Sequence, residues 1–140
     1  MTEKEKAVKV VDKMFNNDPF SQWLGIKRLD DDKGKSQLQM TVRSEMLNGF
    51  DIAHGGITYA LADSCLAFAS NSHGRMSVSV ETSISHTKQL KKGDVVTATA
   101  EEVSLTNKIG IYQIKLTNQE NETVALFKGT VYRTSKNWEV

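Results

Sequence analysis

Residues 55–71 constrain the fold of this chain more than any other segment. Within them, residues 57–69 are rich in alanine and leucine, contain no glycine or proline, and are apolar on nearly every face of a helix. A helix that is hydrophobic all round belongs in the interior of a protein rather than at its surface. We therefore expect a long central helix that the rest of the chain surrounds.

The segments before this helix predict a second helix and two strands. Residues 2–16 favour a helix, because Thr2 and Glu5 fit a capping box and apolar side chains recur at helical spacing. The polar residues 16–18 and Pro19 end it. Two short strands are expected over about 22–30 and 36–43, separated by a polar turn at 30–34.

Beyond residue 71 the hydrophobic period changes to two. Val78, Val80, Thr82 and Ile84 alternate with polar side chains, and similar runs cover about 94–105, 108–118 and 122–134. The breaks between these runs have the length of hairpin turns, which predicts an antiparallel meander of four long strands. Such a sheet has one face to bury, and only residues 55–71 can cover it. We therefore predict an α+β fold of the hotdog type, an antiparallel sheet wrapped around one long central helix.

Length and composition limit what else the chain can be. Its 140 residues suit one domain, and its 18 basic and 17 acidic side chains lack the basic excess of nucleic-acid-binding proteins. No apolar run reaches the ~18 residues that cross a bilayer, and no signal-peptide pattern is visible, so we expect a cytoplasmic protein without a membrane partner. One cysteine and three scattered histidines, of which His73 and His86 have no nearby ligand partner, predict no disulfide, no metal and no cofactor.

Chemistry is concentrated where the central helix begins, at His54, Gly55 and Gly56. The first N–H groups of a helix have no partners within it, and the helix dipole places partial positive charge there. Glycines let a ligand oxygen approach these N–H groups without a Cβ in the way. The arrangement suits the oxyanion that develops during acyl transfer. A plain Gly-Gly turn before a helix is the structural alternative.

Polar side chains form two further features of the segment from Asn48 to Asp63. Asp63 lies within the apolar helix, where a buried carboxylate acquires a shifted pKa or a specific partner. The alternative places it in a narrow solvent-exposed stripe with Ser64 and Ser70. Asn48 and His54 bracket the loop before the helix and could position a thioester or a water molecule. Alternatively, both side chains satisfy only the backbone of that loop.

The spacing between Gly55 and Asp63 has a consequence for the assembly of the protein. Gly55 and Asp63 are eight residues apart, which is about 12 Å along a helix. A reacting carbonyl must lie ~3 Å from both its oxyanion donor and the attacking group. One chain cannot bring both groups to one carbon, whereas two copies can if their central helices lie antiparallel across a twofold axis. If these residues form one site, the protein is a homodimer with a shared site.

The stretch resembles hotdog-fold acyl-CoA thioesterases of the phenylacetate-degradation, or PaaI-like, family, through Asn48-Gly49, His54-Gly55-Gly56 and Leu61-Ala62-Asp63. The resemblance extends over most of the chain. It implies hydrolysis of an acyl-CoA thioester, with Asp63 as the catalytic carboxylate and the Gly55 N–H as donor to the thioester oxygen. It also implies that Asn48 and His54 orient the thioester and the water, and that dimers pair into tetramers. A small aromatic acyl group of the phenylacetyl type follows from the resemblance alone.

The chain departs from the family in the strand after the central helix. Relatives often have Phe-Leu-Arg-Pro there, whereas residues 86–89 of this chain are His-Thr-Lys-Gln. The basic residue is kept as Lys88 and the aromatic and the proline are lost, which leaves the acyl pocket and the choice of substrate open. Candidate substrate-binding residues, chosen by nearness in sequence, are Gly56, Leu47, Phe50, Tyr59 and Leu66.

Basic side chains should surround the entrance to the site, because coenzyme A has several phosphate charges. Lys88, Lys91 and Lys92 cluster near one turn and are the main candidates to bind it. Further candidates on later strands are Lys108, Lys128 and Arg133. Lysines that deter pairing at a sheet edge are the structural alternative for each of them.

Other functional classes fit the sequence less well. A serine hydrolase would need a Gly-x-Ser-x-Gly elbow, which is absent. Hotdog enoyl-CoA hydratases have an Asp-x-Asn-Pro-x-His run, whereas Asp51 and His54 are three residues apart here with no Asn-Pro between them. A non-catalytic acyl-CoA-binding module would keep the fold and the basic rim without needing Asp63 in an apolar helix. Cys65 should pack against the sheet rather than react.

Overall fold

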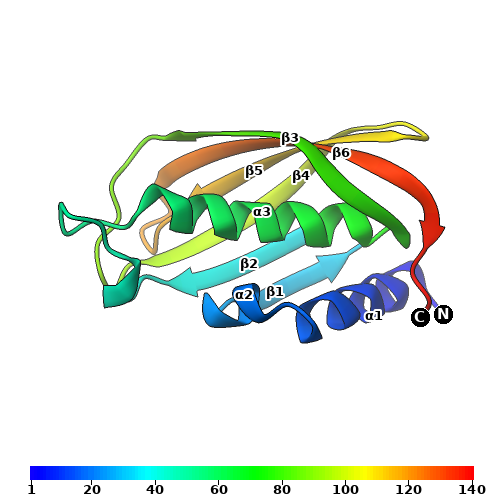
Figure 1. Cartoon of the computed structure of the whole chain (residues 1–140), viewed down its shortest axis with the longest axis horizontal. Coiled ribbons are helices and arrows are strands. Elements are labelled where there is room, and N and C mark those ends of the chain that lie inside the picture. The colour runs from blue at the N-terminus through cyan, green and yellow to red at the C-terminus, as the bar shows by residue number, and fades with distance from the viewer.

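Helix α3 (Gly55–Asn71) lies across one face of a six-stranded antiparallel sheet in the computed structural model, which describes residues 1–140 (Figure 1). The chain begins with α1 (Glu3–Asn16) and α2 (Pro19–Trp23), and a 3-10 helix, η1 (Ser44–Met46), precedes the loop that leads into α3. The strands are β1 (Lys27–Asp32), β2 (Lys35–Thr41), β3 (Arg75–His86), β4 (Val95–Leu105), β5 (Ile109–Thr117) and β6 (Thr123–Asn137). The predicted hotdog fold is confirmed, and the predicted central helix has the bounds that the sequence indicated.

The order of the strands differs from the predicted meander. It is β1-β2-β4-β5-β6-β3, so β3 pairs with β6 at one edge of the sheet rather than with β4. Val78 of β3 lies opposite Tyr132 and His86 lies opposite Ala125. The segment between β3 and β4 therefore crosses to the other side of the sheet and is not a hairpin. A two-residue period identifies a strand but does not name its partner, which explains the error.

The first predicted strand, 22–30, is also wrong in its first half. Residues 19–23 form α2 instead, because the Asp18 carboxylate caps that helix by accepting from the N–H of Ser21, and Pro19 occupies its first turn. Strand β1 begins only at Lys27. The sequence signal for α2 is a capping aspartate followed by proline, which the prediction used only to end the preceding helix.

The core fills the space between α3 and the sheet. Leu61, Cys65 and Phe68 of α3 are fully buried in a cluster of 25 residues that includes the inward-facing side chains of the strands. The Cys65 thiol points at the carbonyl of Ser36, and burial raises the pKa of this thiol to about 12. Cys65 thus packs against the sheet as predicted, and it is protonated and inert at neutral pH.

The chain does not cover α3 on every side. Gly56 and Tyr59 are exposed, and Asp63 and Ala67 are half-buried, so an open stripe runs along the helix on one face. These residues recur at intervals of three and four, which places them on one side of the helix. No helix in the structure is both long enough and apolar enough to span a membrane.

Candidate active site

The beginning of α3 leaves one backbone donor free. His54 is the N-cap residue, and its Nδ1 accepts a hydrogen bond of 2.8 Å from the N–H of Gly56. The next N–H, that of Ile57, donates to the carbonyl of His54 at 2.9 Å. The N–H of Gly55 donates to no group of the chain. Of the two glycines, only Gly55 therefore offers its N–H to a ligand, at the positive end of the helix dipole.

The two glycines are needed for close packing against two imidazoles. A Cβ at Gly55 would lie 3.3 Å from Cε1 of His86, and a Cβ at Gly56 would lie 3.0 Å from Nδ1 of His54. Neither glycine has a positive φ. Glycine at these positions therefore allows close contact with the imidazoles and is not required by the backbone conformation. At Gly55, His86 rather than a ligand occupies the space where a Cβ would lie.

A cavity of about 390 Å³ opens beside Gly55, and Asn48 lines it together with Thr58, His86 and Lys88. The Oδ1 of Asn48 accepts a hydrogen bond of 2.8 Å from the N–H of Phe50, so it satisfies the loop backbone. Its amide nitrogen has no partner in the chain and remains a donor at the cavity. The two predicted roles of Asn48 do not exclude each other, because its amide oxygen bonds to the loop backbone while its amide nitrogen is free to bind a ligand.

Asp63 lies in a second cavity further along α3. It is half-buried, it makes no hydrogen bond or ion pair within the chain, and burial raises the pKa of its carboxyl. The alternative of a stripe of solvated serines is not what the structure shows, because Ser70 is buried and Ser64 bonds to Ser21 at 2.8 Å. The cavity measures about 420 Å³, and its apolar walls include Met14, Leu66, Met76, Val78, Val131 and Trp138.

The two cavities have no lining residue in common. The Gly55 cavity has donors but no acidic side chain, and the Asp63 cavity has the carboxylate beside apolar walls. Within one chain, the donor and the acid are therefore separate, as the helical spacing predicts.

The structure brings only one of the four candidate wall residues to these cavities. Leu66 is buried and lines the Asp63 cavity. Tyr59 lies on the open stripe of α3, where its hydroxyl contacts Thr82 and its ring meets that of Phe127 edge-on, with centroids 5.5 Å apart. Leu47 packs against the core, and Phe50 is 86% exposed at the tip of the loop before α3.

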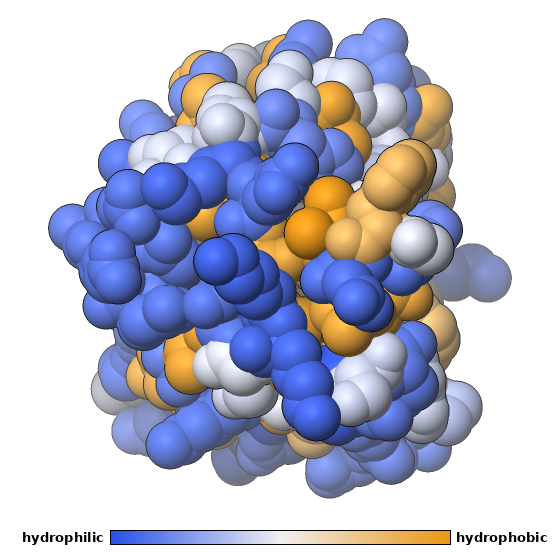
Figure 2. Space-filling view, turned by 90° about the vertical axis from the view of Figure 1, so that its left-hand side faces the viewer, coloured by the Kyte–Doolittle hydropathy of each residue, from blue (hydrophilic) through white to orange (hydrophobic).

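Of the three lysines near one turn, Lys88 alone lines the Gly55 cavity, and its ammonium pairs with Glu122 at 3.1 Å. Lys91 and Lys92 are exposed in the turn before β4. Figure 2 looks onto the end of the molecule where α3 begins, and it shows apolar side chains between hydrophilic ones. Positive charge is thus available near the Gly55 cavity but not inside the Asp63 cavity.

Sequence reasoning missed His86 and Thr58. The Nε2 of His86 lies 2.6 Å from the Oγ1 of Thr58, beside Gly55 and in the same cavity. The two residues are 28 positions apart, so no local motif joins them. The signal that could have found them is the departure at residues 86–89 from the pattern of the family that the chain resembles.

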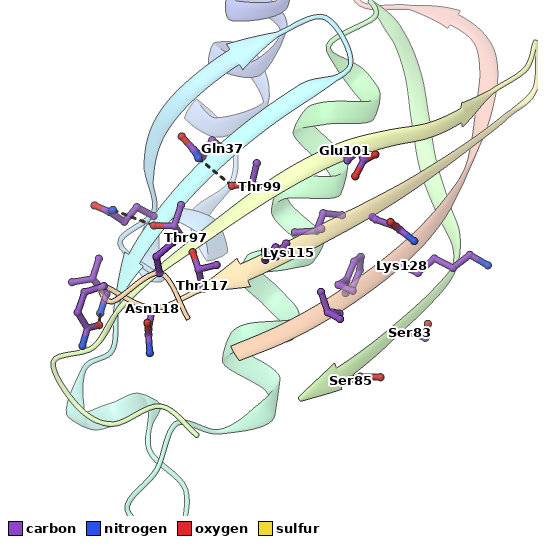
Figure 3. Close-up of a pocket in the computed structure, with 18 residues that line it drawn as sticks. Gln37, Ser83, Ser85, Thr97, Thr99, Glu101, Lys115, Thr117, Asn118 and Lys128 are labelled. Atoms are coloured by element: carbon purple, nitrogen blue, oxygen red, sulfur yellow. Dashed lines mark hydrogen bonds between the residues drawn. The ribbon is translucent and has the colours of Figure 1, made fainter. Parts of the chain in front are cut away.

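The largest cavity of the molecule lies elsewhere. It measures about 960 Å³, and outward-facing side chains such as Gln37, Thr99 and Lys115 line it on the face of the sheet turned away from α3 (Figure 3). Its lining includes neither Gly55 nor Asp63. The largest cavity therefore contains neither of the two main groups of the predicted site.

Comparison with known proteins gives matches over most of the chain. Residues 50–125 match the sequence pattern of the thioesterase superfamily. The acyl-coenzyme A thioesterase PaaI of Escherichia coli is 38% identical over 86% of this chain and 86% of its own length. The solved structure of E. coli PaaI, from the phenylacetic acid degradation operon, superposes with a TM-score of 0.95 at 35% identity and covers 97% of this chain and 99% of that one.

A second solved structure adds a ligand to the comparison. It is a Streptococcus mutans protein bound to acetyl CoA, which is 26% identical with a TM-score of 0.78 and covers 81% of this chain and 91% of its own. The match to the thioesterase superfamily, over residues 50–125, includes the whole of α3.

Proposed function

Because the chain belongs to the thioesterase superfamily, as an acyl-CoA thioesterase of the PaaI family, we propose that it hydrolyses a small acyl-CoA at a site built by two copies of the chain. The observation that supports this most directly is the division of groups along α3. The free N–H of Gly55 and the unpaired carboxylate of Asp63 lie in different cavities of one chain. Two antiparallel copies of α3 would join them.

In the proposed reaction, a water oxygen adds to the thioester carbon and Asp63 takes up the proton that the water loses. The carbonyl oxygen becomes an oxyanion and accepts a hydrogen bond from the N–H of Gly55 of the partner subunit. The C–S bond then breaks, the free acid forms, and coenzyme A leaves as a thiolate that takes up a proton. In the alternative route, Asp63 attacks the carbonyl directly, the C–S bond breaks as coenzyme A leaves as a thiolate, and water hydrolyses the resulting anhydride.

The edge strand β3 supports the dimer. It is 12 residues long and pairs on one side only, and Val78 and Val80 are 57% and 61% exposed. A long edge strand with exposed valines is a template for pairing with a second chain. Two β3 strands in antiparallel pairing would extend the sheet across a twofold axis and place the two α3 helices side by side. A dimer of dimers, which the family resemblance implies, would require a second contact surface.

The Asp63 cavity supports the choice of acyl group. At about 420 Å³, with Trp138, Met76 and Leu66 among its walls, it suits a compact apolar acyl group, including an aromatic one of the phenylacetyl type. Lys88, Lys91 and Lys92 lie near the other cavity, where they would meet the phosphates of coenzyme A. Acetyl CoA bound to the Streptococcus mutans relative supports this class of ligand.

A panel of acyl-CoA compounds with a thiol-detecting reagent tests the proposal. We expect release of free coenzyme A from small and aromatic substrates. Asp63→Asn should reduce kcat by roughly 10²–10⁴-fold, the usual contribution of a positioned general base. Glu5→Gln, which makes the same change at an exposed carboxyl of α1, should leave kcat unchanged. Binding without release would indicate a non-catalytic module instead, and water addition to an enoyl substrate would indicate a hydratase.

The two routes for Asp63 differ in where oxygen from water first appears. A single turnover in ¹⁸O-labelled water places the label in the released acid if Asp63 acts as a general base. Label in the Asp63 carboxylate requires direct attack, because it arises only when water hydrolyses the anhydride at the carboxyl carbon of Asp63. Mass spectrometry of the peptide that contains residue 63 distinguishes the two outcomes.

A further inference from the structure

A hydrogen-bonded chain joins β3 to the first turn of α3. The Oγ1 of Thr58 lies 3.0 Å from the carbonyl oxygen of Gly55 and 2.6 Å from the Nε2 of His86. A hydroxyl has one proton, so it cannot donate to both. Both contacts are hydrogen bonds only if Thr58 donates to Gly55 and His86 donates from a protonated Nε2 to Thr58. The geometry therefore assigns the Nε2–H tautomer to His86.

The same peptide group is held from its other end. The N–H of Gly56 donates to the Nδ1 of His54 at 2.8 Å. The peptide between Gly55 and Gly56 thus has its carbonyl bound through Thr58 to one imidazole and its N–H bound directly to another. These imidazoles come from different parts of the chain, His54 from the loop before α3 and His86 from the end of β3.

The imidazole of His86 also packs against the backbone that carries the free donor. A Cβ on Gly55 would lie 3.3 Å from its Cε1 and 3.7 Å from its Nε2. Pairing of His86 with Ala125 in the sheet fixes the position from which the ring reaches α3. Its Nδ1 has no partner in the chain.

We propose that His86 is a positioning residue, which acts through Thr58 to hold the N–H of Gly55 toward the thioester oxygen. Glycine has the greatest backbone freedom of any residue, and the first turn of a helix lacks half of its hydrogen bonds. An oxyanion donor is effective only if it is aimed before the charge develops. The proposal rests on the proposed thioesterase function, which supplies the oxyanion, and it identifies what orients the donor.

Two substitutions separate the hydrogen bond from the packing of the ring. His86→Phe keeps an aromatic ring but removes the donor, and Thr58→Val removes the hydroxyl while keeping the branched shape. Each should lower kcat about tenfold with little change in KM, because the bond orients a group that acts in the transition state. His86→Gln and Thr58→Ser, which can restore the donor and the hydroxyl, should recover most of the loss. Ser85→Ala, at an exposed neighbour on β3, is the matched control.

The double variant distinguishes a chain of bonds from two separate contributions. If His86 acts through Thr58, combining His86→Phe with Thr58→Val should cost no more than either change alone. Losses that multiply, or a His86→Phe enzyme with wild-type kcat, would overturn the proposal.

A measurement that needs no turnover tests the positioning role of His86 independently of the proposed thioesterase function. The ¹⁵N–¹H resonance of Gly55 should shift, and its amide exchange should accelerate, in His86→Phe and in Thr58→Val but not in Ser85→Ala. The ¹⁵N shifts of the His86 ring should show a protonated Nε2. If wild-type protein releases no coenzyme A yet these shifts occur, the thioesterase proposal fails while the positioning role stands. An unchanged Gly55 resonance contradicts the positioning role whatever the activity.

Discussion

The two cavities along α3 have opposite chemistry. The cavity at the beginning of the helix is lined mainly by polar residues and glycine, with a free backbone N–H at Gly55, an amide at Asn48 and an imidazole at His86. The cavity beside the middle of the helix is mainly apolar, and its ionisable group is Asp63, whose pKa burial raises. The beginning of α3 can stabilise negative charge, and the carboxylate in its middle can accept a proton.

This difference supports the proposal that neither cavity is a complete active site. The Asp63 cavity has the carboxylate that we propose to activate water but not the N–H of Gly55, and the Gly55 cavity has that N–H but no carboxylate. A single chain holds both halves but keeps them about two turns of helix apart. The open stripe of α3 and the exposed edge of β3 are the surfaces through which we propose that a second copy unites them.

Gly55→Pro removes the proposed oxyanion donor at the beginning of α3. Gly55 is the first residue of α3, a position where proline is well tolerated, and His54 before it has φ −62° and ψ 137°, which proline permits. Apart from the ring atoms that it adds, the substitution removes only the N–H that we propose binds the oxyanion. We expect kcat to fall by roughly 10²–10³-fold, the usual effect of losing one oxyanion donor.

Gly55→Ala is the matched control for this prediction. It adds the same Cβ against His86 but keeps the N–H, so its kcat should exceed that of Gly55→Pro by at least about tenfold. Far-ultraviolet circular dichroism should show unchanged helix content in both variants. Equal activities would mean that the N–H of Gly55 is not the donor.

Mixed dimers test whether the two halves come from different chains. When Asp63→Asn and Gly55→Pro proteins are unfolded and refolded together, each mixed dimer has one site with an intact Gly55 and an intact Asp63. Random pairing should restore about a quarter of wild-type activity, since half of the dimers are mixed and each has one working site of two. If each site lay within one chain, the mixture would be as inactive as its components.

The two edges of the sheet sharpen the same comparison. Strand β1 is six residues long and five of them are charged, whereas β3 is 12 residues long and has only two charged side chains before its terminal histidine. Charge protects the first edge from pairing and leaves the second free to pair. We expect Val80→Lys to weaken the dimer at least tenfold, which sedimentation velocity over a concentration series would measure.

Val103→Lys provides the control for this change. Val103 is a similarly exposed valine, 52% against 61%, but it lies on β4, inside the sheet rather than at its edge. Its substitution should not alter the dimer. The Val80→Lys protein should regain activity as its concentration rises, and a monomer with full activity would contradict the shared site.

The sequence predicted the parts of this molecule that depend on local pattern. The continuous apolar character of α3 and the two-residue period of the long strands were sufficient for the hotdog fold, and the motif around Gly55 and Asp63 was sufficient for the candidate site. The partner of β3 was not predictable, because strand pairing depends on contacts far apart in sequence. The same limit concealed the contact between His86 and Thr58, which exists only once β3 lies beside α3. The Asp63 cavity depends in the same way on Trp138, 75 positions further along the chain.

The smallest effect that we expect is on stability. Burial raises the pKa of Asp63 in the folded chain, so folding favours its protonated form. The contribution of this group to stability is fully present below the unfolded pKa and is lost as pH rises through the raised folded pKa. Above that range the buried carboxylate opposes folding, and Asp63→Asn should then raise Tm slightly, in contrast to its large effect on kcat.

The pH dependence of this gain decides whether burial is its cause. Thermal unfolding of wild type and Asp63→Asn should show the variant more stable at neutral pH, with the difference disappearing in acid, where Asp63 is protonated and therefore neutral like asparagine. Glu5→Gln, at an exposed carboxyl, should show no such trend. A gain that persisted in acid would mean that asparagine stabilises by a new contact. The pH dependence of the gain could be absent in the dimer but present in a Val80→Lys monomer. That result would show that the positive end of the partner's α3 offsets the burial of the Asp63 carboxylate, as the shared site requires.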